Sequence, residues 1–178
     1  VQNLKNIISS KIFNSIKEIS VEFGDVHYAF GGFRSKKEIC DGGIFFESGS
    51  EYIDTVLYLT NTNKIDNFNS QVKYIDDLDV HSEGIFDIYD DKNELIKCKF
   101  KFSSIKNTEN KIIIKFENCF IELYLYEDDF DLILNINNKN KFSLADYATK
   151  NYPSDLISQH ATYWENFLNS FKNKKHSY

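Results

Sequence analysis

The sequence contains no methionine, one proline and only three cysteines. Because translation ordinarily starts at methionine, we expect the natural protein to have residues before Val1. Cys40, Cys98 and Cys119 are odd in number and form no C-x-x-C pair, so neither a disulfide framework nor a thiolate metal site is expected. We predict reduced thiols in a cytoplasmic protein, with Cys98 and Cys119 serving as small buried hydrophobic residues.

Long apolar runs and an excess of positive charge are also missing. No apolar run approaches the roughly 20 residues that a membrane span needs, and the first residues, VQNLKNIISSK, have a helical pattern rather than that of a signal peptide. Lys and Arg number 21 against 27 Asp and Glu, which gives a net charge of −6. We therefore expect neither a membrane nor a nucleic acid as a partner.

Several sequence motifs of enzymes are absent as well. The chain has no G-x-G-x-x-G and no P-loop, so nothing in it is expected to bind a dinucleotide or a nucleotide phosphate. It has no G-x-S-x-G of a serine hydrolase. The four histidines lie far apart in sequence, and we predict no metal site.

The residues that are present indicate one globular domain. The chain has 178 residues, of which 42% are hydrophobic and 16% aromatic. Helical spacing predicts helices over 2–12 and about 50–59, and a third that opens at Pro153. Strand patterns fall around Ile19, Val21 and Phe23 and at 71–76, 84–90, 95–103, 111–117, 119–126, 130–136 and 141–145.

The breaks between these later strands are rich in Asn and Asp, which predicts hairpin loops in an antiparallel meander. One open, mainly antiparallel sheet with helices on one face is an α+β fold. In the segment CFIELYLYED, Phe120, Tyr124 and Tyr126 point away from Ile121 and Leu123. A second face this apolar predicts a homodimer contact from sheet to sheet. The alternative is a monomer with scattered, half-exposed aromatic residues.

Chemistry-bearing residues gather in the stretch CDGGIFFESGSEYIDTVLYL. Gly42 and Gly43 precede the carboxylates Glu47, Glu51 and Asp54, which lead into an apolar helical stripe. We expect Ser50 to cap this helix. The glycine-rich segment 24–43 ahead of it is predicted to be a long loop, of the kind that commonly lies over a site.

The segment GGIFFESGSEYIDTVLYL resembles the pattern G-G-x-x-x-D-x-G-x-H-x-x-D-x-x-x-x-L in the C-terminal domain of the glucose–fructose oxidoreductase and inositol dehydrogenase (Gfo/Idh/MocA) family. Its flanks agree: LKNIISSKIFNSIKEISVEFGD is similar to the linking helix and first strand of that domain, and YWENFLNSFKNKK to its closing helix. The resemblance covers the chain from about Leu4 to Lys175.

The resemblance implies a fold like the C-terminal domain of glyceraldehyde-3-phosphate dehydrogenase. It implies that residues 1–178 are a substrate-binding and dimerisation domain for a sugar or sugar nucleotide. NAD or NADP would then be held by an N-terminal Rossmann domain that is absent from this chain. In the family, a lysine of that lost domain works with the Asp and the His of the motif to orient and deprotonate a hydroxyl during hydride transfer.

Carried over residue by residue, Gly42 and Gly43 match the glycine pair beside the substrate. Glu47 stands at the Asp position, and Glu51 stands where the family has His, so these two are the candidate catalytic residues. Histidine suits proton transfer near neutral pH far better than a carboxylate does. This departure leaves a second hypothesis open, a binding module that kept the fold and lost the chemistry. Asp54 matches a structural acidic position.

Four further residues are candidates for substrate binding by the same resemblance. His27, Tyr28 and Arg34 lie in the loop that it places over the substrate, where Arg34 could clamp a carboxylate or phosphate. His160 lies on the last helix. The alternative for each is a packing role in its own segment. A third hypothesis is an unrelated α+β interaction domain in which the glycine motif is coincidental.

Overall fold

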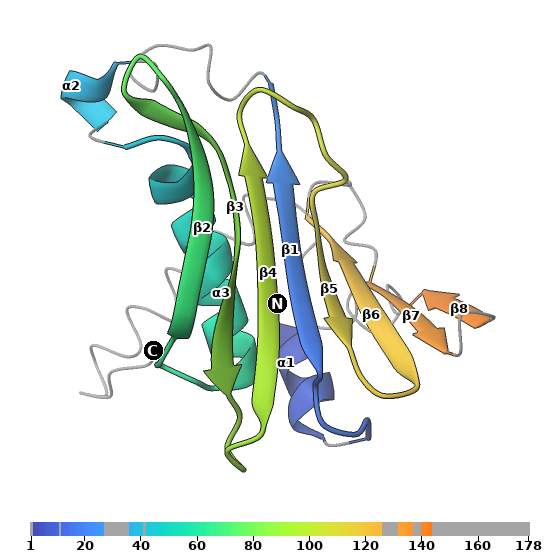
Figure 1. Cartoon of the computed structure of the whole chain (residues 1–178). Coiled ribbons are helices and arrows are strands. Elements are labelled where there is room, and N and C mark those ends of the chain that lie inside the picture. The colour runs from blue at the N-terminus through green and yellow to red at the C-terminus, as the bar shows by residue number, and fades with distance from the viewer. Residues whose placement is uncertain are drawn as a thin grey trace, which may run out of the picture.

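The structure, a computed structural model, describes residues 2–10, 12–26, 36–40, 42–125, 132–136 and 140–143. Its strands form one open sheet in the order β2-β3-β4-β1-β5-β6-β7-β8 (Figure 1). Strands β1 and β4 run parallel, and the other neighbouring pairs run antiparallel. The strands are β1 Glu18–Gly24, β2 Asp66–Ile75, β3 Leu78–Tyr89, β4 Leu95–Ser103, β5 Lys111–Lys115, β6 Cys119–Tyr124, β7 Leu132–Ile136 and β8 Asn140–Ser143.

In the part of the chain that the structure describes, four helical segments precede most of the strands. They are α1 Gln2–Ser9, α2 Lys37–Cys40, the π-helix η2 Phe45–Gly49 and α3 Ser50–Thr60. Helices α1 and α3 lie side by side on one face of the sheet (Figure 1). The predicted open, mainly antiparallel sheet with helices on one face is therefore confirmed. The helix expected from Pro153 lies outside the described residues.

The hydrophobic core lies between these helices and the sheet. Alternation places one set of side chains of β1, β4 and β5 toward the helices, and these side chains are buried. Val56 and Leu59 of α3 are 0% and 2% exposed against them. Aromatic rings complete the layer, since Phe45 lies 5.5 Å from Phe100 and Tyr52 lies 6.0 Å from Phe102 between ring centroids.

The prediction of a continuous meander is wrong, because β1 lies between β4 and β5. The segment after β4 therefore passes the end of β1 instead of forming a hairpin. Gly24 at that end donates its N–H to Asn110 Oδ1 at 2.7 Å and accepts from the Thr108 N–H at 3.1 Å. Loop composition reveals a turn, but it does not reveal which strand the chain passes on the way.

Candidate functional site

The stretch from Gly42 to Thr60 is one continuous helical body after a glycine turn. The helix begins near Ile44, and the π-helix η2 leads directly into α3 without a break. The predicted cap at Ser50 is wrong: Gly49 before it is helical, and the Ser50 hydroxyl donates to the Phe46 carbonyl at 2.6 Å. A single-turn π-helix inside an α-helix is frequent at functional sites.

Asp79, the second residue of β3, holds the start of this helix instead. Its Oδ1 accepts the Gly43 N–H at 2.6 Å, and its Oδ2 accepts the Phe45 N–H at 2.7 Å. The first amides of a helix have no partner within the helix, and a carboxylate there also interacts favourably with the helix dipole. Sequence reasoning missed Asp79 because it lies 36 residues after Gly43, in a different element.

The motif glycines are required by close packing. A Cβ atom on Gly43 would collide with the carbonyl oxygen of Asp79, and one on Gly49 would lie 2.7 Å from the Phe102 ring. A Cβ atom on Gly42 would lie 2.7 Å from the Cβ of Phe46. Gly43 thus lets the turn approach β3, and Gly49 lets η2 approach β4.

The carboxylates of the motif all lie on this helical body. Glu47 is half-buried within η2, and its N–H donates to the Gly43 carbonyl at 3.0 Å. Glu51 and Asp54 are exposed on α3. Phe46 is 67% exposed next to Glu47, so an aromatic ring also faces solvent in this turn. Sequence patterning alone offers no reason to separate Phe46 from Phe45, which is half-buried and packs against the core.

The structure therefore places four of the predicted site residues in one continuous segment: Gly42 and Gly43 in the turn, and Glu47 and Glu51 on the helical body that follows. The other four lie outside the described residues, so the structure does not locate them: His27, Tyr28, Arg34 and His160.

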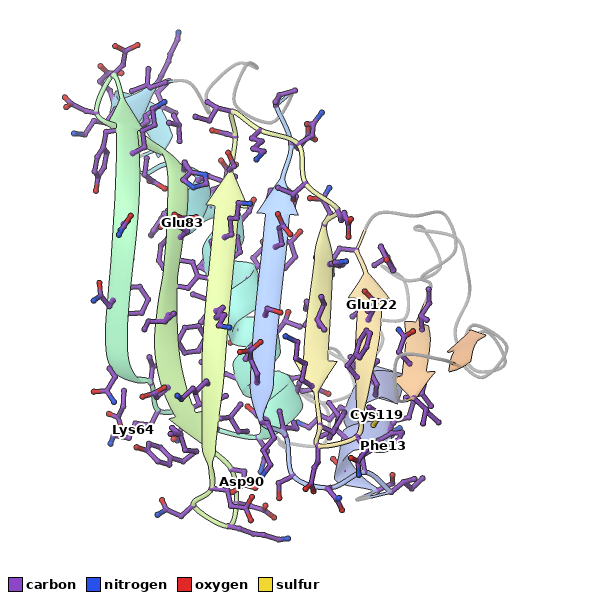
Figure 2. The ribbon with its side chains drawn as sticks, turned by 45° about the vertical axis from the view of Figure 1, so that its right-hand side comes forward. Phe13, Lys64, Glu83, Asp90, Cys119 and Glu122 are labelled. Atoms are coloured by element: carbon purple, nitrogen blue, oxygen red, sulfur yellow. The ribbon has the colours of Figure 1, made fainter. Side chains whose placement is uncertain are left out.

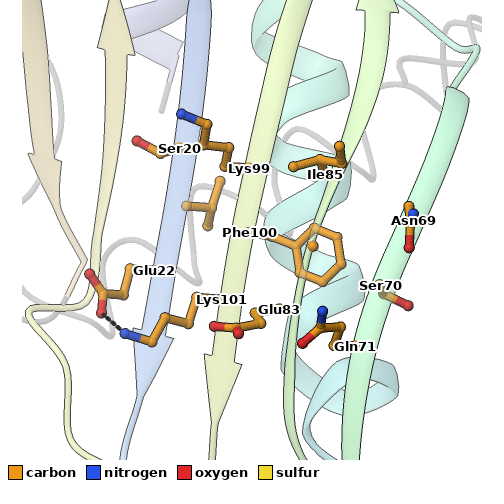
Figure 3. Close-up of a pocket in the computed structure, with 12 residues that line it drawn as sticks. Ser20, Glu22, Asn69, Ser70, Gln71, Glu83, Ile85, Lys99, Phe100 and Lys101 are labelled. Atoms are coloured by element: carbon orange, nitrogen blue, oxygen red, sulfur yellow. Dashed lines mark hydrogen bonds and ion pairs between the residues drawn. The ribbon is translucent and has the colours of Figure 1, made fainter.

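A separate groove of about 500 Å³ lies over β2, β3, β4 and β1. Polar side chains line it on the side of the sheet opposite α3, and they include Glu22, Glu83 and Lys101 (Figure 3). Glu47 and Glu51 are not among its lining residues. The groove and the helical motif are therefore different places on the molecule.

The sheet face away from the helices, which we call the open face, carries alternating strands of opposite charge. Glu18 of β1 pairs with Lys99 of β4 at 2.6 Å and with Lys115 of β5 at 2.8 Å, and Glu22 pairs with Lys101 at 3.2 Å. Hydrogen bonds from Lys115 and Lys99 hold the pKa of Glu18 below its ordinary value.

Farther along the open face, Glu122 of β6 is largely buried (Figure 2). It accepts from Asn135 at 3.0 Å and from Lys111 at 3.3 Å. Phe120 and Tyr124 beside it are half-buried. This end of the open face is thus only partly exposed to solvent.

Cys98 is buried as predicted, whereas Cys119 is half-buried. Burial raises the pKa of the Cys98 thiol to about 12, so this thiol is a packing residue and not a nucleophile. Within the described part of the chain, no group of three or more His, Cys, Asp or Glu side chains is arranged to hold a metal ion. No helix of that same part is long and apolar enough to cross a membrane.

Comparison with known proteins defines the class of the fold. No protein-family model matches the chain, and no curated protein sequence is significantly similar to it. Solved structures do match, and they include inositol dehydrogenase homologues, levoglucosan dehydrogenase and other oxidoreductases of the Gfo/Idh/MocA type. The fold predicted from the glycine motif is thereby confirmed.

Three of these structures illustrate the likeness. An inositol dehydrogenase homologue from Azotobacter vinelandii, complexed with NAD+, has a TM-score of 0.65 at 10% identity over 80% of this chain and 40% of its own. A mutant of KijD10, a 3-ketoreductase from Actinomadura kijaniata in complex with TDP-benzene and NADP, has a TM-score of 0.72 at 11% identity. The match covers 99% of this chain and 52% of KijD10. Levoglucosan dehydrogenase, in complex with NADH and levoglucosan, has a TM-score of 0.61 at 12% identity. The match covers 79% of this chain and 41% of that enzyme. The chain thus spans about two fifths to one half of these proteins.

Proposed function

We propose that this chain is the C-terminal, substrate-binding and oligomerisation domain of an NAD(P)-dependent oxidoreductase that acts on a hydroxyl of a sugar or sugar nucleotide. The observation that carries the proposal is the placement of Glu47 and Glu51 on one helical body directly after the Gly42–Gly43 turn, within this fold. NAD or NADP would be held by a preceding Rossmann domain, and we expect the whole protein to be cytoplasmic.

In this proposal the helical motif contacts the substrate while the preceding domain presents the nicotinamide. Glu47 accepts a hydrogen bond from the reacting hydroxyl, and Glu51 lies one turn later as the second carboxylate. A carboxylate that receives a proton in the transition state contributes about 10²- to 10⁴-fold to the rate. The loop with His27, Tyr28 and Arg34, and the helix with His160, would complete the substrate site.

The test uses the natural protein, with the residues that precede Val1 included. It should bind NADH or NADPH, measured by fluorescence, whereas this chain alone should not. On a panel of sugars and sugar nucleotides, Glu47→Gln should lower kcat/KM by about 100-fold or more. The control Asp54→Asn changes an exposed carboxylate of the same helix and should leave kcat/KM within about twofold of wild type. Failure of the longer protein to bind NAD(P)H would overturn the proposal.

A second candidate function is favoured by Glu51, which replaces the expected histidine and is exposed on α3. In that case the chain is a non-catalytic binding module of the same fold. Glu51→His in the longer protein separates the two: an enzyme should change its pH–rate profile, because imidazole titrates near neutral pH. A module should stay inactive on every sugar tested.

The proposed homodimer contact is made by the open face, which carries Phe120 and Tyr124 on β6 and Ile85 on β3. Ile85 is 54% exposed there, between Lys99 of β4 and Asn69 of β2. An apolar residue at the centre of a polar surface is typical of a protein interface. Ile85→Glu should convert a dimer into a monomer in analytical ultracentrifugation, whereas Ile105→Glu, in the loop after β4, should not. A weak dimer, with a dissociation constant of about 100 µM, would be substantially populated at that concentration. A wild-type chain that stays monomeric at about 100 µM would therefore overturn this assignment.

A further inference from the structure

The tip of the β2–β3 hairpin is attached to the segment that carries the glycine motif. Asp79 contributes both carboxylate oxygens, one to the Gly43 amide at 2.6 Å and the other to the Phe45 amide at 2.7 Å. Two residues earlier, Asp77 in the hairpin turn forms an ion pair with Lys37 of α2 at 3.8 Å. The hairpin thus contacts the motif segment on both sides of the glycine pair.

Asp79 is itself held in place by its own strand. Its neighbours Leu78 and Val80 are each only 8% exposed. The Val80 carbonyl accepts both the N–H of Ser104 at 2.9 Å and its hydroxyl at 3.3 Å, which ties this end of β3 to the end of β4. A buried, hydrogen-bonded strand therefore fixes the position from which the carboxylate reaches the turn.

A short chain of bonds connects Asp79 to Glu47. Asp79 holds the Gly43 amide, and the carbonyl of the same Gly43 accepts the Glu47 N–H at 3.0 Å. Because Gly43 has no Cβ, its backbone can lie directly against Asp79. Asp79 and the backbone of Glu47 are thus joined through a single residue, Gly43.

We propose that Asp79 is a positioning residue of the substrate site, which acts through the Gly43 and Phe45 amides to fix Glu47. The inference deepens the proposed function and rests on it for the identity of the substrate. Charge-assisted hydrogen bonds to a carboxylate are roughly twice as strong as neutral ones. Asparagine would keep one acceptor oxygen and place an NH₂ group against the second amide, whereas alanine would keep neither.

The first experiment measures backbone amide exchange by NMR on this chain and needs no substrate. Asp79→Asn should raise the exchange rates of Gly43, Phe45 and Glu47 about tenfold or more, and Asp79→Ala should raise them further. The Val56 amide in α3 should change much less. Asp87→Asn is the matched control, because Asp87 lies on the same strand and accepts from the Asn67 side chain at 2.8 Å.

A role in overall stability alone predicts a different pattern. Loss of global stability would speed exchange at every amide that exchanges by global unfolding, Val56 included. Ile114→Val should open a small cavity in β5, far from the turn, and so lower the stability of the whole domain. Its exchange pattern serves as the comparison. Equal changes at Glu47 and Val56 in Asp79→Asn, or unchanged exchange at Gly43 and Phe45, would overturn the positioning role.

The second experiment measures kcat and KM of the longer protein for the sugar or sugar nucleotide that it uses best. Asp79→Asn should raise KM or lower kcat by about tenfold while the pH–rate profile keeps its shape, because Glu47 remains present but is poorly placed. Asp87→Asn should leave both constants unchanged. If no substrate is found, the proposed function fails while the exchange experiment still decides whether Asp79 holds the turn. Full activity of Asp79→Ala on a working enzyme would refute the inference.

Discussion

At Gly43 the backbone lies against the carbonyl oxygen of Asp79, with no room for a side chain. Gly43→Ala should therefore push the turn away from β3 and weaken both hydrogen bonds to Asp79. We expect the free energy of unfolding to fall by about 1–3 kcal/mol, the usual cost of overpacking, as measured by urea denaturation. Ser50→Ala, at an exposed site seven residues later in the chain, should change it by less than about 0.5 kcal/mol. A Gly43→Ala variant as stable as the wild type would contradict the close approach of Gly43 to Asp79.

Glu18 makes stability depend on pH in a defined direction. Its pKa lies below the ordinary value of 4.5 because Lys115 and Lys99 donate to its carboxylate. The unfolded chain takes up the proton first as pH falls, so the contribution of Glu18 is complete above about pH 4.5 and is lost as pH falls through the lower folded pKa.

The measurement compares wild type with Glu18→Gln by chemical denaturation at several pH values. The wild type should be more stable by about 1 kcal/mol at pH 7, and the difference should shrink below pH 4.5 and vanish once Glu18 is protonated in the folded chain as well. Glu94→Gln, whose partner Lys17 lies 3.8 Å away at an exposed site, is the control and should show little dependence. A difference that grows as the pH falls would contradict the assigned ion pairs.

Among the helices that the structure describes, α3 places the most buried hydrophobic side chains in the core. Leu59 near its end is 2% exposed and belongs to the core with β1 and β4. Leu59→Ala should cost about 2–5 kcal/mol because it leaves a cavity beneath the helix. Leu95→Ala, at a β4 position that is 42% exposed, should cost far less. Thermal denaturation followed by circular dichroism checks both, and similar losses would mean that α3 is not packed as described.

The success of sequence reasoning for these elements depended on regular alternation. Strand β4 was predicted over its full length, 95–103, because its apolar residues alternate with lysines. The starts of β2 and β3 were missed by five and six residues. The first half of β2 is polar, its pairing with β3 is irregular between Asp66 and Asn69, and β2 is exposed along most of its length. Its pattern therefore carries no signal of a buried face.

The candidate site was predictable only in part for a related reason. The spacing of glycines and carboxylates identified the segment from Gly42 to Asp54, because that signal is local in the chain. The cap from Asp79 and the insertion of β1 between β4 and β5 depend on contacts between distant segments, which no local pattern specifies.

The molecule as a whole is acidic, but its open face is not. The chain has a net charge of −6, yet the open face is nearly balanced, because each lysine row lies beside a strand with carboxylates. The paired strands place these groups on that face: Glu18, Glu22, Glu83, Asp87 and Glu122 with Lys97, Lys99, Lys101, Lys111 and Lys115. Two copies can therefore approach through these strands without the repulsion that a face of one charge sign would produce.

This balance predicts how a dimer through the open face should respond to salt. Its carboxylates are already paired with lysines of the same chain, so contacts across the interface would gain little from new ion pairs, and Ile85 would supply an apolar contact. Raising the ionic strength from about 0.1 M to about 1 M shortens the screening length from about 10 Å to about 3 Å. We expect the dissociation constant to change by less than about threefold over this range, measured by sedimentation equilibrium. A dimer that weakens tenfold or more must instead be held by charges between the two copies, and its interface would then lie elsewhere than on the open face.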